Sequence, residues 1–433
     1  MARAPFALLG TVQVTLIAAI TVITVALPAI GRDLHLNGSG LVLVSASYGV
    51  SFGSLLLLGG RLADSFGHRR IFITGMVIFG LASAAAGLAP WLVALVIARF
   101  AEGAGAALAA PAAAGLLSAA IPCPQRRRRV LATWGVLSST GAIAGTVLSG
   151  VLITWAPWRW IFAAPAVVAA AAAAAAPRVL PAGPTPVPGR IGWPGAMLAA
   201  AGLATLIYGL QRPGWAILVG VGLLAVFGLA ESRSTAPLIP APFLARHALP
   251  LAAVLACAAA MAAAFFLLSL YLQQVRGLSA LQTSAAFLLP APAVAAGPLA
   301  ARMIAHSGTR PTLAAGLLTA AGGLVLLSFL SMPYPGLLIF PFGTGLAFSA
   351  ATVAAMQDAA ADQGGLAAGL VNTAMETGPP LGLAAATRIA TAHSHQPSNG
   401  YPFALRTAAL MLLAVALFTM ISRHAGHTEE EER

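Results

Sequence analysis

Residues 60–70 read GRLADSFGHRR and lie between two apolar runs, 41–59 and 71–89. The hydrocarbon core of a bilayer is about 30 Å thick, and an apolar helix of about 20 residues crosses it. Gly67 permits a tight reversal of the chain with a positive φ angle. The stretch therefore predicts two membrane-spanning helices joined by a short charged loop.

The composition extends this prediction to the whole chain. Of its 433 residues, 59% are apolar and only 8% are charged, whereas a soluble domain carries roughly 25% charged residues. These proportions exclude a water-soluble globular fold and a disordered chain. The predicted fold class is all-α, a polytopic protein whose partner is the lipid bilayer.

Apolar runs long enough to span a membrane recur along the sequence. The first is too long for the apolar region of a signal peptide, so we interpret it as an uncleaved spanning helix. The sequence predicts fourteen spans in all. They are 6–30, 41–59, 71–89, 92–119, 130–153, 160–177, 192–210, 214–230, 249–272, 281–301, 311–331, 335–356, 365–387 and 402–422.

The basic residues indicate how the chain is oriented. The formal charge is +12, and all 23 basic residues are arginines that lie almost wholly in the gaps between apolar runs. This placement argues against nucleic acid as a partner and is typical of charges held outside a bilayer. With both termini in the cytoplasm, sixteen arginines fall on the inner side and six on the outer side. We therefore expect cytoplasmic termini in a bacterial inner membrane.

Two longer gaps divide the runs into groups. The gap 178–191 is rich in proline and glycine, and together with 231–248 it isolates two runs from six before and six after. We predict an N-terminal six-helix bundle over 1–185, two additional transmembrane helices with linkers over 186–245, and a C-terminal six-helix bundle with a cytoplasmic tail over 246–433.

An internal repeat relates the two bundles. The residues Arg61, Gly67, Arg69 and Gly75 recur with the same spacing, each 241 positions later, as Arg302, Gly308, Arg310 and Gly316. Each set falls between the second and third run of its half. Duplicated helical halves around a central pathway are typical of secondary transporters.

The loop over 60–70 resembles the loop between the second and third helices of the major facilitator superfamily. The fourteen runs resemble its fourteen-span drug:proton antiporter family. The resemblance implies a major facilitator fold with two pseudo-symmetric six-helix bundles plus two extra helices, and a cytoplasmic latch in this loop. A positive inner loop with a turn glycine is the alternative. Asp64 is expected to pair with an arginine or to cap a helix. The latch residues are Gly60, Arg61, Asp64, Gly67, Arg69 and Arg70.

Residues 99–107 read RFAEGAGAA and resemble the fourth-helix motif of the family, with Glu102 in place of a glutamine. Arg99 lies about 8 residues, or ~12 Å, into the membrane. Such an arginine must face a polar interior, because burying it costs at least ~2.5 kcal/mol. Arg99 and Glu102 share a helix face. We expect Arg99 to tune a proton-binding acid; a structural ion pair is the alternative.

The fifth run resembles the antiporter motif of drug exporters. However, Thr146 stands where the family has a proline, and Ser149 stands where it has a glycine. Close helix packing through Gly141, Gly145 and Gly150 is about equally favoured.

Residues 369–378 read GLVNTAMETG and resemble the corresponding helix of the fourteen-span family, with Glu376 where that family often has glutamine. Glu376 lies about 11 residues into its run, where an acid is rarely tolerated without a purpose. We expect a protonatable or substrate-contacting role; a hydrogen bond between helices is the alternative. The expected cavity residues are Asn372, Met375 and Trp134.

Only Glu102 and Glu376, of eleven acids, lie deep within apolar runs. The first helix of the family usually carries an acid, and its position here is Ala19. Glu102 and Glu376 are therefore the candidate proton carriers, with Arg99 as the cation that tunes them.

Other chemistry is not indicated. A phosphate-binding loop of the GKS type requires lysine, which the chain lacks. His393 and His395 have no acid or cysteine beside them, so no metal site is predicted. Trp158 and Arg159 are sufficiently explained as an aromatic belt with an arginine anchor at the membrane interface. No clustered nucleophile and base indicates an enzyme.

The sequence therefore predicts a proton-coupled secondary transporter that exports amphipathic or hydrophobic drugs or natural products by alternating access. It needs no cofactor, because the proton gradient drives it, and we expect a monomer. One alternative is a facilitator-family carrier of another metabolite, such as an amino acid. The other is a non-transporting membrane sensor or scaffold.

Overall fold

The computed structural model describes two compact units, and every regular element within the described residues is helical. One unit comprises Met1–Leu238 and Leu272–Ala285, and the other comprises Ile239–Tyr271 and Ala286–Arg433. The described residues are 3–119, 141, 144–181, 193–211, 214–234, 241–290, 293, 295–331, 333–357, 364–392 and 397–421.

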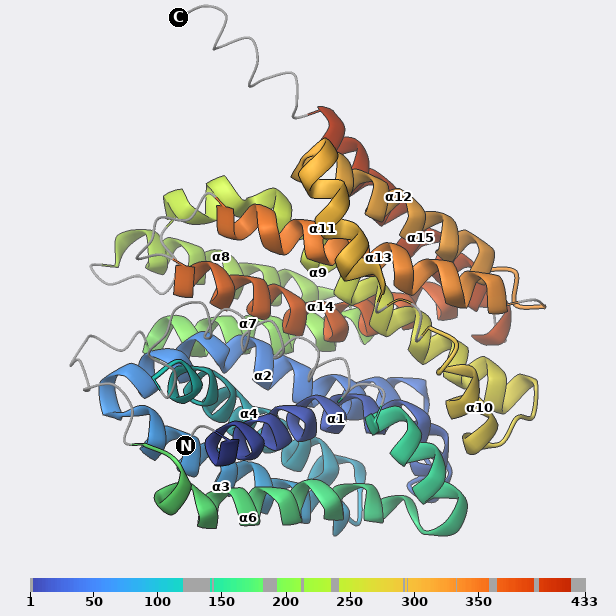
Figure 1. Cartoon of the computed structure of the whole chain (residues 1–433). Coiled ribbons are helices and arrows are strands. Elements are labelled where there is room, and N and C mark those ends of the chain that lie inside the picture. Colours follow the sequence, from blue (N-terminus) through green and yellow to red (C-terminus); the bar gives the residue numbers. More distant parts are fainter. Residues whose placement is uncertain are drawn as a thin grey trace, which may run out of the picture. The chain divides into compact units, whose positions relative to one another are not determined.

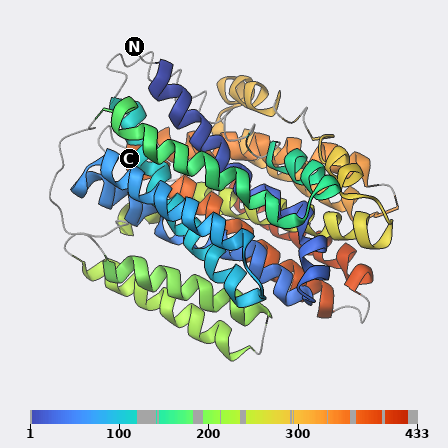
Figure 2. The ribbon, with the colours of Figure 1, turned by 90° about the horizontal axis from the view of Figure 1, so that it is seen from below.

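The first unit is a bundle of long apolar helices (Figure 1). Within it α2 packs against α4 and α7, and α3 packs against α4 and α6. Helices α7 and α8 pack against each other as a hairpin (Figure 2). The elements are α1 (Arg3–Asp33), α2 (Gly38–Phe66), α3 (His68–Gly87), α4 (Leu92–Ala119), a helix over Ala144–Trp155, the 3₁₀ helix η1 (Trp158–Phe162), α6 (Ala163–Val179), α7 (Trp193–Gln211) and α8 (Trp215–Arg233).

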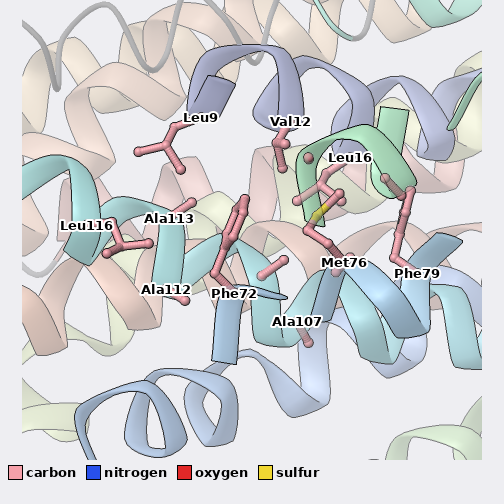
Figure 3. Close-up of a cluster of buried hydrophobic side chains, with 14 of the residues drawn as sticks. Leu9, Val12, Leu16, Phe72, Met76, Phe79, Ala107, Ala112, Ala113 and Leu116 are labelled. Carbon is pink, nitrogen blue, oxygen red and sulfur yellow. The ribbon is translucent and has the colours of Figure 1, made fainter. Parts of the chain in front are cut away.

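An apolar core holds this unit together (Figure 3). Leu9, Val12 and Leu16 of α1 meet aromatic and sulfur-containing side chains of α3, among them Phe72 and Met76. Alanines of α4 fill the remaining space, so backbones approach closely where side chains are small. These buried side chains pack around α4.

The second unit pairs α12 with α13 and α15, and α9 with α14 and α13. The chain enters the first unit after α9, through a π-helical turn, and returns after α10. The elements are α9 (Ala241–Leu270), the π-helix η2 (Tyr271–Val275), α10 (Ala280–Ala286), α11 (Ala296–Ser307), α12 (Thr309–Leu327), α13 (Tyr334–Gln357), α14 (Gly364–Ala392) and α15 (Pro397–Ile421).

Ten described helices are long and apolar enough to cross a membrane, and Ala144–Trp155 and Met197–Leu210 are shorter apolar helices. The prediction of one helix over 281–301 is wrong, because α10 ends at Ala286 and α11 begins at Ala296. Pro290 lies in the break, where its missing N–H and its ring oppose a continuous helix. The count of fourteen spans and the boundaries 1–185, 186–245 and 246–433 stay predictions.

The two repeat segments have the same local geometry. Gly67 ends α2 and precedes α3 with φ 95°, and Gly308 ends α11 and precedes α12 with φ 86°. The predicted positive φ of Gly67 is therefore confirmed. A Cβ at Gly75 would collide with the backbone of α4, and a Cβ at Gly316 would collide with the backbone of α13. These matched contacts support an internal duplication.

Candidate functional site

Arg99 and Glu102 form an ion pair in the middle of α4. Arg99 Nη1 lies 2.7 Å from Glu102 Oε2, and both residues are 0% exposed. The side chains meet because residues three apart lie on one helix face. The sequence therefore predicts their proximity correctly, while their part in proton coupling stays a prediction.

Three other elements surround this pair. Arg99 Nη1 also donates a 3.1 Å hydrogen bond to the Ala19 carbonyl of α1. The guanidinium carbon lies 4.8 Å from the ring centre of Tyr48 on α2 and 6.0 Å from that of Phe162 in η1. Arg99 Nε and Nη2 and Glu102 Oε1 have no hydrogen-bond partner in the described part of the chain. Arg99 therefore contacts α1, α2 and η1 as well as Glu102.

Small residues of α4 set the position of the pair. A Cβ at Gly103 would collide with Ser51 Oγ and the Tyr48 carbonyl of α2, and a Cβ at Gly105 would lie 2.5 Å from the Phe79 nitrogen of α3. Glycine at these two points lets α4 lie directly against both neighbouring backbones. The pair is thus held in a tightly packed part of the bundle.

The loop around Gly67 differs from its predicted contacts. Asp64 was expected to pair with an arginine or to cap a helix. Its Oδ1 lies 3.5 Å from His68 Nε2, while Arg69 Nη1 donates to the Leu180 carbonyl at 3.2 Å. No Asp64–arginine ion pair is found within the described residues, and Gly67, with φ 95°, separates Asp64 near the end of α2 from His68 at the start of α3.

The remaining predicted latch residues lie before and after the Asp64–His68 contact in the sequence. Gly60 and Arg61 lie near the end of α2, and Arg70 is exposed in the first turn of α3. Asp64 is exposed, whereas His68 is buried. The latch role of these residues stays a prediction.

On α14, Glu376 is only 5% exposed. Within the described residues its carboxylate has neither a hydrogen-bond nor an ion-pair partner. Asn372, one turn earlier, is exposed, and Met375 is half-buried. Trp134, the third expected cavity residue, lies outside the described residues. Glu376 and the Arg99–Glu102 pair belong to different units.

The three glycines of the fifth run are points of close backbone approach. A Cβ at Gly141 or at Gly145 would lie 2.6 Å from a main-chain carbonyl of α1. A Cβ at Gly150 would collide with the hydroxyl of Ser284, which donates to the Thr146 carbonyl at 3.0 Å. The geometry favours packing as the reason for these glycines.

Sequence reasoning missed a polar cluster at the end of α1. Asp33 Oδ2 accepts hydrogen bonds from Trp158 Nε1 at 2.9 Å and Arg159 Nη1 at 2.6 Å, and Arg159 Nη2 donates to the Ala89 carbonyl at 3.5 Å. Trp158 and Arg159 therefore connect η1 to α1. The sequence had indicated only a role at the membrane interface for these two residues. Asp33 and Trp158 are 125 residues apart, so no spacing pattern in the sequence reveals the cluster.

The residues that the structure describes contain no group of three His, Cys, Asp or Glu side chains that could hold a metal ion.

Sequence reasoning also missed one buried histidine, His247. His247 Nδ1 lies 2.8 Å from the Phe243 carbonyl of its own helix, and its Nε2 has no partner among described residues.

Comparison with known proteins identifies the family. The sequence profile described as Major Facilitator Superfamily matches residues 9–383. The chain is 31% identical over 453 positions to the puromycin resistance protein pur8 of Streptomyces alboniger, covering 95% of this chain and 89% of that one. It is 33% identical over 435 positions to the cephamycin export protein CmcT of Amycolatopsis lactamdurans, covering 93% and 88%.

Among solved structures, the fold is similar to the POT family transporter PepTSo, with a TM-score of 0.73 at 13% identity over 99% of both chains. The chain is therefore a multi-pass membrane transporter, not an enzyme, and it belongs to the Major Facilitator Superfamily.

Proposed function

We propose that the chain exports amphipathic or hydrophobic drugs or natural products in exchange for protons, by alternating access. Relatives named for puromycin resistance and cephamycin export support the export of such molecules. The observation that carries proton coupling is the fully buried Arg99–Glu102 pair, which also contacts α1, α2 and η1.

In the proposed cycle, Glu102 exchanges its ion pair with Arg99 for a proton. When Glu102 is ionised, Arg99 neutralises it. When Glu102 is protonated, that attraction is lost, and the guanidinium keeps the Ala19 carbonyl and the Tyr48 and Phe162 rings as partners. Protonation thus changes the balance of contacts between α4 and its neighbours, which is what a shift between two conformations requires.

Glu376 is the second candidate proton carrier. The proton gradient is the proposed energy source, without a cofactor, and the proposed unit is a monomer in a bacterial inner membrane with cytoplasmic termini. Substrate would enter from the cytoplasm or the inner leaflet.

The test uses inside-out membrane vesicles from a host that lacks its own drug pumps. An imposed pH gradient should drive uptake of a fluorescent hydrophobic dye, and an uncoupler should abolish it. Glu102→Gln should be inserted normally yet lose the pH-driven component. The matched control is Glu231→Gln, which removes an acid at the end of α8 and should transport normally. Unchanged pH-driven uptake by Glu102→Gln would remove Glu102 as the carrier.

A further inference from the structure

The hydroxyl of Ser83 on α3 lies between Glu102 and η1. Ser83 is 0% exposed, and its hydroxyl donates a 3.0 Å hydrogen bond to the Phe162 carbonyl of η1. The same hydroxyl also interacts with the carboxyl group of Glu102 on α4, the helix against which α3 packs. Ser83 therefore connects the candidate proton carrier with an element whose Phe162 ring also lies near Arg99.

Buried serines of α2 form a different kind of hydrogen bond. Ser47 donates to the Val44 carbonyl at 3.1 Å. Ser54 donates to the Val50 carbonyl at 2.6 Å. Bonds of this kind, to a carbonyl three or four residues earlier, are usual for a serine within a helix. Ser83 instead donates to a residue 79 positions away, so its hydrogen is committed to another element.

The direction of this hydrogen bond determines what Ser83 offers to Glu102. A serine hydroxyl has one hydrogen and two acceptor lone pairs. Because the hydrogen is donated to the Phe162 carbonyl, only lone pairs are available to Glu102. Accordingly, Glu102 Oε1 is buried without a hydrogen-bond partner in the described chain. An ionised carboxylate gains nothing from a lone pair, whereas a protonated carboxyl group donates its O–H to one.

We infer that Ser83 is a positioning residue that holds Glu102 in its proton-bound form; the inference rests on the proposed exchange of protons. The incoming proton forms an O–H bond with Glu102 Oε1, which then donates a hydrogen bond to Ser83 Oγ. Glu102 Oε2 stays an acceptor for Arg99 Nη1, which lies 2.7 Å away. The proton-bound acid, Ser83 and the Phe162 carbonyl form one chain of hydrogen bonds from α4 through α3 to η1.

Arg99 is the charged side chain that acts on Glu102 within the described residues. Helix α4 packs on α1, α2 and α3. At this level α1 contributes the Ala19 carbonyl, and α2 contributes Tyr48, whose hydroxyl donates to a main-chain carbonyl of α1 at 3.1 Å. The groups that face the acid are thus one cation, one phenol that is already hydrogen-bonded, and the Ser83 hydroxyl.

The other ionisable side chains of the neighbouring elements lie far from this level. On α1, α2 and α3 they occur at 3, 32 and 33 and between 61 and 70. These positions are thirteen or more residues, or about 20 Å along each helix, from Ala19, Tyr48 and Ser83. In η1, Arg159 is paired with Asp33. A change in titration caused by Ser83 therefore reports on Glu102.

The test is a pH titration of the purified full-length protein, followed by infrared difference spectroscopy. A protonated carboxyl group has a C=O stretching band that is separate from the bands of a carboxylate. The band of Glu102 is identified by its loss in Glu102→Gln and its persistence in Glu376→Gln. Ser83→Ala should move the midpoint of this band by about 0.5–1 pH unit toward lower pH, because the proton-bound form loses one hydrogen bond.

Ser54→Ala is the matched control. It removes a buried serine hydroxyl whose hydrogen bond lies within its own helix, so the midpoint should stay unchanged. Thermal unfolding of both variants separates the two roles of Ser83. Loss of the bond to the Phe162 carbonyl alone would lower the melting temperature without moving the titration.

Two results would overturn the inference. One is a midpoint that is unchanged in Ser83→Ala, or that moves to higher pH as it would if Ser83 donated to the carboxylate. The other is a Glu102 band that does not titrate over the pH range in which the protein stays folded.

The proposed export function is tested separately, by dye uptake in inside-out vesicles. In these vesicles the pH of half-maximal uptake should shift in Ser83→Ala in the same direction as the infrared midpoint. A shifted infrared midpoint without any pH-driven uptake by the unmodified protein would support the proton site and refute the export function.

Discussion

Arg99 on α4 donates a hydrogen bond of 3.1 Å to the main-chain carbonyl of Ala19 on α1. Position 19 is where the first-helix acid of the family would stand, and the acid that pairs with Arg99 here comes from its own helix, as Glu102. The Arg99 guanidinium therefore contacts both Ala19, where the family's acid is missing, and Glu102, the acid that is present.

This relationship predicts that an acid at position 19 can replace the acid at position 102. Glu102→Gln should abolish pH-driven export, and Ala19→Asp added to it should restore at least about a tenth of the original rate, a gap of about 1.4 kcal/mol. The reason is that Arg99 already contacts the backbone of residue 19, so an aspartate there would bring a carboxylate close to the guanidinium. Dye uptake in inside-out vesicles measures the effect.

The control for this exchange is Ala26→Asp in the same Glu102→Gln background. Ala26 is buried on the same face of α1, about 10 Å farther along the helix. Equal recovery with an aspartate at position 26 would show that contact with Arg99 is not the cause.

The contact of Gly103 with α2 predicts a stability effect. Gly103→Ala should destabilise the protein by about 1–3 kcal/mol, because the added methyl group collides with Ser51 and the Tyr48 carbonyl. Thermal unfolding in detergent measures it. Gly222→Ala on α8 is the matched control, since no atom lies within 4 Å of the added carbon. Similar melting temperatures for the two variants would contradict the close packing of α4 on α2.

The two repeat loops predict a pair of matching effects. Gly67→Ala and Gly308→Ala should each destabilise the protein by about 1–3 kcal/mol, because a side chain strains a backbone with positive φ. Gly38→Ala and Gly297→Ala, which have open space and ordinary φ angles, should be nearly neutral. A loss in only one of the two loops would argue against their structural equivalence.

The cluster around Asp33 predicts a weak, salt-sensitive contribution. Asp33→Asn should lower the melting temperature slightly, because the partly exposed charge pair with Arg159 is lost. The difference should shrink at high ionic strength, which screens exposed charges. A double-mutant cycle with Arg159→Gln isolates the pair, and an additive result would show that the two side chains do not interact in solution.

Much of this architecture could be predicted because its determinants are local. Apolar runs define helices by length alone, and the spacing of Arg99 and Glu102 places both side chains on one face. The break after Ala286 was also encoded locally, by Pro290, but the apolar run conceals it. Chain reversal at Gly67 follows from the freedom of glycine to adopt positive φ.

The contacts that could not be predicted join distant segments. Arg99 reaches Ala19 across 80 residues, and Asp33 reaches Trp158 across 125. His68 as the partner of Asp64 was missed for another reason, because three nearby arginines were stronger candidates by charge. The ring of His68 lies against Gly115 of α4, and such a tertiary contact is not visible in the local sequence.

The close contacts of Gly103 and Gly105 imply an uneven mutational landscape along α4. In a saturation mutagenesis scan, variants at Gly103 and Gly105 should be depleted. Ile97 and Phe100, which are exposed, should accept many replacements. The two glycines, which carry no side chain, thereby determine the positions of the Arg99 and Glu102 side chains. Enlarging a single glycine would displace Arg99 and Glu102 while leaving both of them chemically intact.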